Sequence, residues 1–431
     1  MPSKVLNGPS CLKGIFVPPG DKSISHRAVM FGALAEGQSS FTHFLEAEDC
    51  LRTLTAFECM GVPMGLEKGT GRLTVDGVGL SGLCAPKGDL DMGNSGTSMR
   101  ILLGILAGQR FKATLTGDPS LSSRPMRRVT QPLKKMGAQI KGRDNGNFAP
   151  LVIHGGRLKG IDFVNELSSA QVKSALLFAG LYAEGQTRIQ EFIPSRDHTE
   201  RFLRMCGAPL RQEGEWLVVE KAVRLSPLHM AIPGDISAAA FFLVGAAMTP
   251  GSFLTIENVC LNPTRTGVIR VLERMGAKIE IKRLKEEPEP VGCIYTEGCR
   301  LKGTRIPKEE IPALIDELPI LMVAMALAEG ESLITGAHEL RVKETDRIQS
   351  MVHNLNAIGG SLQELPDGCI IKGVEHFSSG TGQSFGDHRT AMSLAVASLA
   401  AEGEIRVEDI DCVATSFPAF FAEFERLKQA A

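Results

Sequence analysis

The chain has 431 residues, of which 43% are hydrophobic and 22% are charged, and its formal net charge is −2. This length favours two or three domains, and the composition supplies enough apolar side chains for sizeable cores. The near-neutral charge argues against a general nucleic-acid-binding protein, which usually carries a basic excess.

The cysteines and the apolar segments point to a cytoplasmic protein. The ten cysteines form no Cys-x-x-Cys pair and no zinc-like spacing with histidine, so we expect reduced thiols and no metal site. Residues 1–10 contain no basic-then-apolar leader. The most apolar stretch, 318–328, is too short to span a bilayer and predicts a buried helix.

In chain order, one pattern recurs six times: an Ala- and Leu-rich helix that ends near a glycine and leads into a short strand. The expected helices run over 26–37, 97–108, 172–185, 236–251, 318–330 and 388–403. The closing glycines are roughly one sixth of the chain apart, so the repeats fill the sequence. Glycine is expected to cap each helix because it adopts positive φ without a Cβ clash.

A second helix follows in each copy. In five copies it ends at a glycine preceded by Met, Cys or Ile, namely at Gly61, Gly137, Gly207, Gly276 and Gly359. The sixth is expected to start near Ser416 and to run to the end of the chain. Segments such as 72–77 and 216–219 have the β-branched alternation of a hairpin. The predicted unit is therefore strand–helix–strand–helix–hairpin.

The repeats predict an α/β protein with two domains of three units each. A unit this long favours closed domains over a solenoid, whose repeats are usually shorter. The expected domains are 21–233 and, for the second, 1–20 with 234–431. The sixth copy lacks a hairpin, and we expect the strand 13–17 to fill that vacancy in the last repeat.

Candidate functional residues gather where the first helices begin. Helix N-termini expose free N–H groups and partial positive charge, and the small residues of 93–97 would let an anion approach the backbone. Ser25, Ser237 and Asp387 are expected to be helix caps. Lys22 and Arg27 flank one such start, which is unfavourable unless an anion balances them.

More cations open the second helices. Arg124, beside Pro125, and the pair Lys343 and Arg347, spaced for one helical face, indicate anion binding. For Arg127, Arg128 and Arg341 a solvated helix face is the preferred interpretation.

Asp316 and Glu344 are candidates for proton transfer. Burial would raise a carboxylate pKa and neighbouring cations would lower it, so the two could be tuned apart. A helix cap for Asp316 and an ordinary ion pair for Glu344 are equally compatible with the spacing. The sequence contains no Walker A motif, and no cofactor is expected.

Together, the segments 20–27, 93–97, 124–126, 343–347 and 387–389 resemble the EPSP synthase family of aromatic amino-acid biosynthesis. The resemblance covers essentially the whole chain. It implies two inverse α/β domains with the active site in the cleft between them, and shikimate 3-phosphate and phosphoenolpyruvate as substrates. The substrate hydroxyl adds to the enol carbon, and loss of phosphate then leaves an enolpyruvyl ether, without a metal or organic cofactor. We expect a monomer.

The resemblance also implies roles for individual residues. Asp316 would be the general base, with Glu344 and Lys22 handling the other protons. Shikimate 3-phosphate would contact Lys22, Ser23, Arg27, Ser169, Gln171, Arg196, Asp316 and Lys343. Phosphoenolpyruvate would contact Lys22, Asn94, Gly96, Arg124, Gln171, Arg347 and Arg389.

Two departures resemble the divergent second class of this family. Ala170 stands where many members have serine, and the segment 414–418 lacks a lysine common there, whereas Arg196 and Thr415 occur in similar segments of that class. Gly96 is retained at the position that contacts glyphosate, an inhibitor of this family.

Two other functions fit the sequence less well. A related enolpyruvyl transferase acts on UDP-N-acetylglucosamine, but it typically has a Lys-Asn pair where this chain has Asp21-Lys22-Ser23. A non-catalytic repeat scaffold would not need cations at its helix starts.

Overall fold

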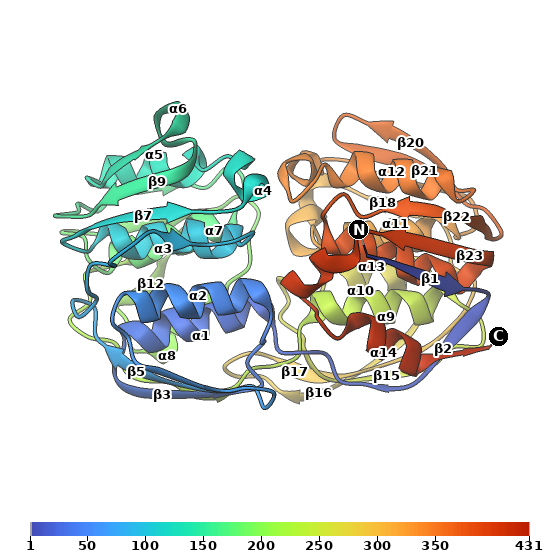
Figure 1. Cartoon of the computed structure of the whole chain (residues 1–431), viewed down its shortest axis with the longest axis horizontal. Helices are drawn as coiled ribbons and strands as arrows, with labels where there is room; N and C mark the ends of the chain where they lie inside the picture. Colours follow the sequence, from blue (N-terminus) through green and yellow to red (C-terminus); the bar gives the residue numbers. More distant parts are fainter. Residues whose placement is uncertain (1, 431) are drawn as a thin grey trace. The chain divides into compact units, whose positions relative to one another are not determined.

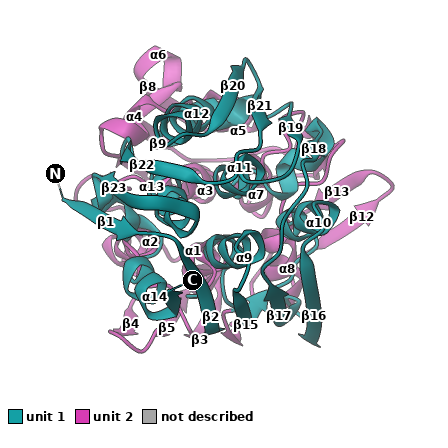
Figure 2. Ribbon diagram, turned by 90° about the vertical axis from the view of Figure 1, so that its right-hand side faces the viewer, with its two compact units in different colours: residues 1–19, 233–431 teal, residues 20–232 magenta. Residues whose placement is uncertain are grey.

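The computed structural model describes residues 2–430 and divides into two compact units. Unit 1 consists of Met1–Pro19 and Pro233–Ala431, and unit 2 of Gly20–Ile232 (Figure 2). In each unit the sheets form an outer layer around the first helices of the repeats (Figure 1). Within the described residues, no helix combines the length and the apolar character needed to cross a membrane.

Unit 2 contains three sheets of four strands. Its first repeat comprises α1 (Lys22–Leu34), β3 (Glu36–Thr42), α2 (Glu48–Cys59), β4 (Met64–Glu67) and β5 (Arg72–Val78). The second comprises β6 (Leu90–Asp91), α3 (Gly96–Ala107), β7 (Lys112–Thr116), α4 (Pro119–Ser123), α5 (Arg127–Met136), β8 (Gln139–Gly142), α6 (Arg143–Gly146) and β9 (Phe148–His154). The third comprises β10 (Asp162–Val164), α7 (Ala170–Gly180), β11 (Thr187–Gln190), α8 (His198–Met205), β12 (Leu210–Glu213) and β13 (Trp216–Val219), and β14 (His229–Ala231) ends the unit.

Unit 1 contains the other three repeats, which follow the same plan. The fourth repeat comprises α9 (Ile236–Met248), β15 (Phe253–Cys260), α10 (Gly267–Arg274), β16 (Lys278–Lys285) and β17 (Val291–Glu297). The fifth comprises β18 (Arg305–Ile306), η1 (Lys308–Ala313), α11 (Leu318–Ala326), β19 (Glu331–Ile334), η2 (His338–Val342), α12 (Arg347–Ala357), β20 (Ser361–Leu365) and β21 (Gly368–Lys372). The sixth comprises β22 (Phe377–Gln383), α13 (His388–Ala397), η3 (Ser398–Ala400), β23 (Ala401–Glu408), η4 (Ile410–Thr415), α14 (Phe420–Leu427) and β24 (Lys428–Ala430).

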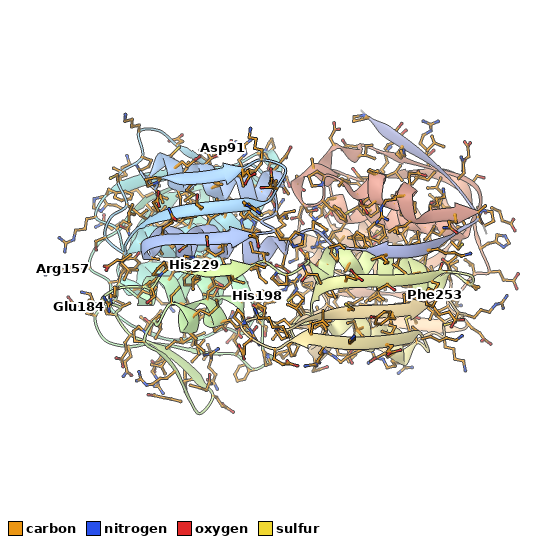
Figure 3. All side chains as sticks on the ribbon, turned by 90° about the horizontal axis from the view of Figure 1, so that it is seen from below. Asp91, Arg157, Glu184, His198, His229 and Phe253 are labelled. Carbon is orange, nitrogen blue, oxygen red and sulfur yellow. The ribbon has the colours of Figure 1, made fainter. Side chains whose placement is uncertain are left out.

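The sheets share one pairing rule. We call the strand before the first helix of a repeat its leading strand. The strand after the first helix pairs in parallel with a leading strand and antiparallel with one strand of a hairpin, as in β10–β11 and β11–β13. Two leading strands pair in the sheet of a repeat other than the one that they precede. β14, which precedes α9, pairs with β3, and β2 (Ser10–Phe16), which precedes α1, pairs with β15. Figure 3 labels His229 on β14 and Phe253 on β15.

The N-terminal strand predicted to complete the last repeat is a different one from the strand observed there. Residues 13–16 belong to β2, which lies between β15 and β24 in the sheet of the fourth repeat. The vacancy in the sixth repeat is filled by β1 (Ser3–Asn7), which runs antiparallel to β23. β1 takes this place because the sixth copy has no hairpin strand to pair with β23 there.

The helix ends also correct one expectation. Gly108 is the C-cap residue of α3, as predicted, but the other five first helices end three or more residues before their predicted glycines. For example, α1 ends at Leu34, and Gly37, with φ 114°, is already the second residue of β3. The glycines after the second helices do close them. At α2, the N–H of Gly61, φ 87°, donates to Glu58 and that of Val62 to Phe57, a Schellman-type end.

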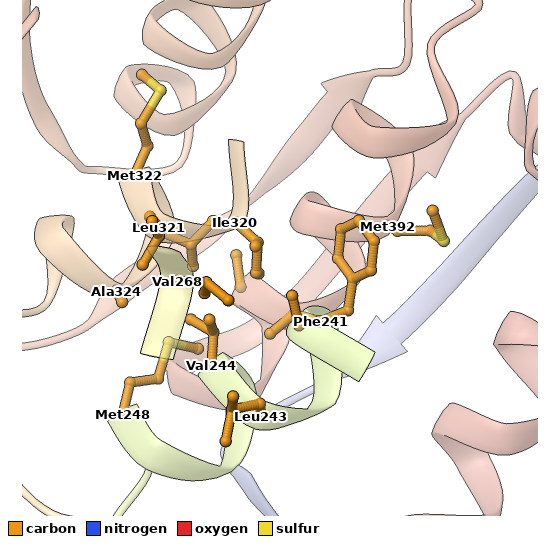
Figure 4. Close-up of a cluster of buried hydrophobic side chains, with 14 of the residues drawn as sticks. Phe241, Leu243, Val244, Met248, Val268, Ile320, Leu321, Met322, Ala324 and Met392 are labelled. Carbon is orange, nitrogen blue, oxygen red and sulfur yellow. The ribbon is translucent and has the colours of Figure 1, made fainter. Parts of the chain in front are cut away.

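The cores lie around the first helices. Every residue of α9 and of α11 is buried, as expected for helices that are apolar on all sides. Figure 4 shows α9 side chains such as Phe241 and Val244 packed with Ile320 of α11. In unit 2, α3 and α7 approach so closely that a Cβ at Gly104 would lie 2.1 Å from the Ala175 carbonyl oxygen. These buried helices fix the N-termini that carry the candidate site.

Candidate active site

The N-terminal turns of α1, α3 and α7 lie together at one end of unit 2. Arg27 of α1 donates from Nη2 to Ser174 Oγ of α7 at 2.8 Å, and Gln171 of α7 donates to Thr97 Oγ1 of α3 at 2.9 Å. Because these contacts join the same ends of the helices, three sets of free N–H groups point toward one region. This is the anion-attracting arrangement that the helix starts predicted.

Lys22 begins α1 and forms an ion pair with Asp49 of α2. Both side chains are mostly buried, at 18% and 10% exposure. Asp49 was not singled out from the sequence, although an acidic first turn on α2 was visible. The cap of α1 is Asp21, whose Oδ1 accepts from Ile24 N at 2.9 Å. Ser25, expected to be the cap, instead accepts from Leu45 N at 3.1 Å.

Arg27 is 3% exposed and joins three helices. Its Nε donates to Thr199 Oγ1 of α8 at 2.7 Å and its Nη1 to the Ser23 carbonyl oxygen at 2.9 Å, in addition to the bond with α7. The oxygens that accept these three bonds are neutral hydroxyl and carbonyl groups. The guanidinium is therefore rigidly held at the helix N-termini, beside Ser23.

A second cation pair surrounds Gly96 at the start of α3. A Cβ at Gly96 would lie 3.1 Å from Arg100 Nη1 and 3.4 Å from Arg124 Nη1. Arg124 is 5% exposed and donates from Nη2 to Asn94 Oδ1, while Asn94 Nδ2 donates to Asp118 at 2.7 Å. The cradle therefore combines backbone N–H groups, an amide and two guanidinium groups.

Arg100 is a site residue that the sequence analysis missed. Its Nη1 donates to Gln171 Oε1 at 2.6 Å, and its Nη2 to the Pro125 carbonyl oxygen at 3.3 Å. The signal was present, because Arg100 is the one charged residue of helix α3 and follows Gly96 by one turn.

Ser169 and Arg196 lie on two neighbouring loops of unit 2. Ser169 is the N-cap residue of α7, and its N–H donates to Asn165 Oδ1 at 3.4 Å. Ser168 before it adopts φ 48°, in the left-handed region. Arg196 follows the buried Ser195 in the loop that leads into α8 and is partly exposed.

Arg347 is the centre of the candidate site in unit 1. This side chain is 1% exposed and contacts three carboxylates: Asp387 at 2.7 Å, Glu344 at 2.5 Å and Asp316 at 3.2 Å. Burial alone would lower the pKa of Arg347, but attraction to Asp387, Glu344 and Asp316 outweighs burial and raises it. The guanidinium thus stays charged and fixes the two carboxylates proposed for proton transfer.

Arg389 lies beside this cluster. Its Nη1 donates to the Asp316 carbonyl oxygen at 2.9 Å, and its Nε is 3.7 Å from Asp316 Oδ1. Asp387 caps α13 and accepts from Arg389 N at 2.8 Å, so the expected cap is present. Asp316 is not a cap, because the N-cap residue of α11 is Glu317.

Two expectations about unit 1 were wrong. Lys343 and Arg347 do not share a helical face, because α12 begins at Arg347 and Lys343 is extended after η2. Burial, reinforced by the charge of Arg347, lowers the pKa of Lys343 against the opposing effect of Asp316 and other carboxylates. Ser237 does not cap α9; Asp235 does, and Ser237 donates to the buried Glu317.

The structure therefore places the sequence-predicted residues in two sets. Unit 2 holds the set with Lys22, Arg27 and Arg124, and unit 1 holds the set with Asp316 and Arg347. Among residues 2–430, no group of three or more His, Cys, Asp or Glu side chains could hold a metal ion. The groups available for chemistry are cations, carboxylates, amides and helix N-termini.

Comparison with known proteins gives one consistent family. The family model for EPSP synthase (3-phosphoshikimate 1-carboxyvinyltransferase) matches residues 6–424. The 3-phosphoshikimate 1-carboxyvinyltransferase of Pelobacter propionicus is 50% identical over 98% of this chain and 98% of its own. That of Methylococcus capsulatus is 52% identical over 95% of this chain and 93% of its own.

Solved structures agree with these matches. The EPSP synthase of Acinetobacter baumannii has a TM-score of 0.87 and 46% identity, covering 99% of this chain and 98% of that one. The enolpyruvyl transferase NikO of Streptomyces tendae has a TM-score of 0.79 at 16% identity, which shows a shared fold alone.

Proposed function

The chain belongs to the EPSP synthase family, the 3-phosphoshikimate 1-carboxyvinyltransferases, and we propose how its residues divide the work of that reaction. The reaction transfers the enolpyruvyl group of phosphoenolpyruvate to the 5-hydroxyl of shikimate 3-phosphate and releases phosphate. It is a step of aromatic amino-acid biosynthesis. The observation that carries the assignment of residues is the gathering of cations at the helix N-termini of each unit.

The negative charge of the two substrates explains why their site needs several cations. Phosphoenolpyruvate and shikimate 3-phosphate together carry roughly five to six negative charges, counting each phosphate as about −1.5 to −2 and each carboxylate as about −1. In our proposal phosphoenolpyruvate is bound by Lys22, Asn94, Gly96, Arg124, Gln171, Arg347 and Arg389. Shikimate 3-phosphate contacts Lys22, Ser23, Arg27, Ser169, Gln171, Arg196, Asp316 and Lys343. Arg100, which flanks Gly96 and holds Gln171, supports the phosphoenolpyruvate residues.

The chemistry proceeds by addition and then elimination. Asp316 takes the proton of the 5-hydroxyl group while the hydroxyl oxygen attacks C2 of phosphoenolpyruvate. C3 gains a proton in the same addition, and the product is a tetrahedral intermediate. Loss of a C3 proton and of phosphate then leaves the enolpyruvyl ether. Glu344 and Lys22 handle the C3 and phosphate protons. Support for Asp316 comes from its position, because its carboxylate lies 3.2 Å from Arg347 Nη1 and 3.7 Å from Arg389 Nε, two arginines proposed to bind phosphoenolpyruvate.

The same proposal concerns assembly and location. We propose that the enzyme acts as a monomer in the cytoplasm. None of its ten cysteines forms a disulfide bond, as expected in a reducing compartment. Its substrates are small molecules, and its net charge of −2 gives no basic surplus for nucleic acid.

The division of residues can be tested by measuring KM for each substrate separately. Arg124→Lys removes a planar, multidentate donor, so KM for phosphoenolpyruvate should rise by at least about tenfold, or ~1.4 kcal/mol, with KM for shikimate 3-phosphate within about twofold. Arg127→Lys is the control, because Arg127 is exposed and pairs with Asp144 at 2.8 Å. An equal rise in both KM values for Arg124→Lys would contradict the assignment.

A further inference from the structure

A buried ion cluster lies beneath the start of α7. Lys173, whose side chain is 4% exposed, is 2.8 Å from Glu191 Oε2 and 2.7 Å from Glu200 Oε1. Burial would lower the pKa of Lys173, but attraction to Glu200 and Glu191 outweighs burial and raises it. The ammonium group of Lys173 therefore stays charged and lies between the two carboxylates.

Of the two carboxylates, Glu191 also binds two loops. It follows β11 directly, and its Oε1 accepts from Asn165 Nδ2 at 2.6 Å and from Ser195 Oγ at 2.6 Å. Its Oε2 accepts from Ser195 N at 3.0 Å. Asn165 and Ser195 are 2% and 3% exposed, so these are buried, charge-assisted hydrogen bonds, the strong kind.

Each of these loops carries a residue proposed to bind shikimate 3-phosphate. Asn165 Nδ2 also donates to the Ser169 carbonyl oxygen at 3.1 Å, which links Glu191 to Ser169 through one side chain. Ser195 is the residue immediately before Arg196, and its N–H and hydroxyl are both bound by Glu191. One carboxylate thus fixes the backbone on both sides of this part of the site.

We infer that Glu191 is a positioning residue for the shikimate 3-phosphate subsite, acting through Asn165 on Ser169 and through Ser195 on Arg196. It touches no substrate itself. Lys173 contacts Glu191 Oε2 at 2.8 Å and also donates to the Ser195 carbonyl oxygen at 3.3 Å. The inference rests on the proposed function, because it concerns how the residues assigned to this substrate are held.

A purely structural role predicts a different result, and Glu200 separates the two. Glu191→Gln and Glu200→Gln each remove one carboxylate from Lys173, so both should lower stability by similar amounts. Glu191→Gln turns one of the two accepting oxygens into an NH₂ group, and whichever oxygen is replaced, at least one hydrogen bond that Ser195 donates to Glu191 is lost. Glu200→Gln leaves the bonds from Asn165 and Ser195 to Glu191 in place.

The experiment measures steady-state KM for both substrates in the full-length protein. We expect Glu191→Gln to raise KM for shikimate 3-phosphate by about tenfold or more and to leave KM for phosphoenolpyruvate within about twofold, the loss typical of a charged hydrogen bond. Glu200→Gln should leave both KM values within about twofold. Asn165→Ala breaks only the link to Ser169, keeps the ion cluster, and should shift KM in the same direction as Glu191→Gln.

Three results would overturn the inference: an unchanged KM for shikimate 3-phosphate in Asn165→Ala, an equal rise for both substrates in Glu191→Gln, or the same rise in Glu200→Gln. If Glu191→Gln does not fold, Asn165→Ala decides. Wild-type protein that releases no phosphate from the two substrates would instead overturn the proposed function, so the two failures are distinct.

Discussion

Arg347 Nε donates to Asp387 Oδ2 at 2.7 Å, and the two side chains are 1% and 0% exposed. The other oxygen of Asp387 accepts from the N–H of Arg389 and so caps α13. One carboxylate therefore connects the start of α12 with the start of α13 and sets the positions of two proposed substrate-binding arginines. The fifth and sixth repeats are coupled at the site through this pair.

Asp387→Asn should destabilise the protein strongly. Asparagine can still cap α13, so the change isolates the loss of the ion pair and leaves Arg347 with two carboxylates. Removing one partner of a buried pair costs about 3–5 kcal/mol, and we expect the lower end because the other carboxylates remain. Urea unfolding measures the change.

Asp346→Asn is the matched control. Asp346 also caps a helix and also pairs with an arginine, Arg341 at 2.6 Å, but both side chains are about one quarter exposed, at 25% and 26%. The expected loss is below about 1 kcal/mol. Equal losses for the two variants would contradict the importance of burial at Asp387.

Asp316→Ala should abolish turnover while shikimate 3-phosphate still binds. The proposed base disappears, and general-base catalysis typically contributes about 10²–10⁴-fold. Single-turnover kinetics and equilibrium binding of shikimate 3-phosphate check the two halves of the prediction. Glu310→Gln is the control, since Glu310 forms an ion pair with Arg274 at 2.9 Å on a partly exposed surface. Near-normal turnover of Asp316→Ala would remove Asp316 from the role of base.

His26 should make the protein sensitive to acid. It is fully buried, with Nδ1 2.7 Å from Thr53 Oγ1, and burial, then Lys22 and Arg27, lowers its pKa well below the ordinary 6.5. Below about pH 6.5 the unfolded chain binds a proton at His26 that the folded chain does not bind. The free energy of unfolding should therefore fall as pH falls, by up to about 1.4 kcal/mol per pH unit from this group.

His26→Gln should reduce this slope between pH 6.5 and 5, as measured by urea unfolding at several pH values. The exposed His338 provides the control variant His338→Gln, which should keep the slope. An unchanged slope in His26→Gln would show that His26 titrates alike in both states.

The cysteines should differ sharply in reactivity. Cys59 and Cys84 are exposed, whereas burial raises the pKa of the Cys206 thiol and of the Cys369 thiol to about 12. Because the thiolate is the reactive form, a thiol reagent at pH 8 should label Cys59 and Cys84 quickly and the two buried thiols only on unfolding. Mass spectrometry of the labelled peptides measures this, and rapid labelling of Cys206 in folded protein would contradict it.

Local patterns in the sequence predicted much of the fold. The six first helices were located to within a few residues at their starts, because apolar composition and polar start residues are local signals, as in α9 beginning at Ile236. Pairing between distant strands was not predictable this way. β1 and β23 are some 400 residues apart, and nothing in Ser3–Asn7 alone identifies β23 as its partner.

The same distinction between local signals and long-range contacts applies to the site residues. Lys22 was visible because a cation at a helix start is locally unfavourable, Arg124 because it stands beside Pro125, and Arg347 because of its spacing from Lys343. Arg100 and Glu191 were missed because their importance comes from contacts with other repeats, Gln171 for one and Ser195 for the other. Lys343 was placed on a helix because its spacing from Arg347 fits one, but the chain there is extended before α12 begins.

The most direct test of the central claim is substrate-dependent phosphate release. The purified protein is mixed with phosphoenolpyruvate and either shikimate 3-phosphate or UDP-N-acetylglucosamine, and inorganic phosphate is followed over time. We predict release with shikimate 3-phosphate only. Release with UDP-N-acetylglucosamine only, or with neither acceptor, would contradict the proposed reaction.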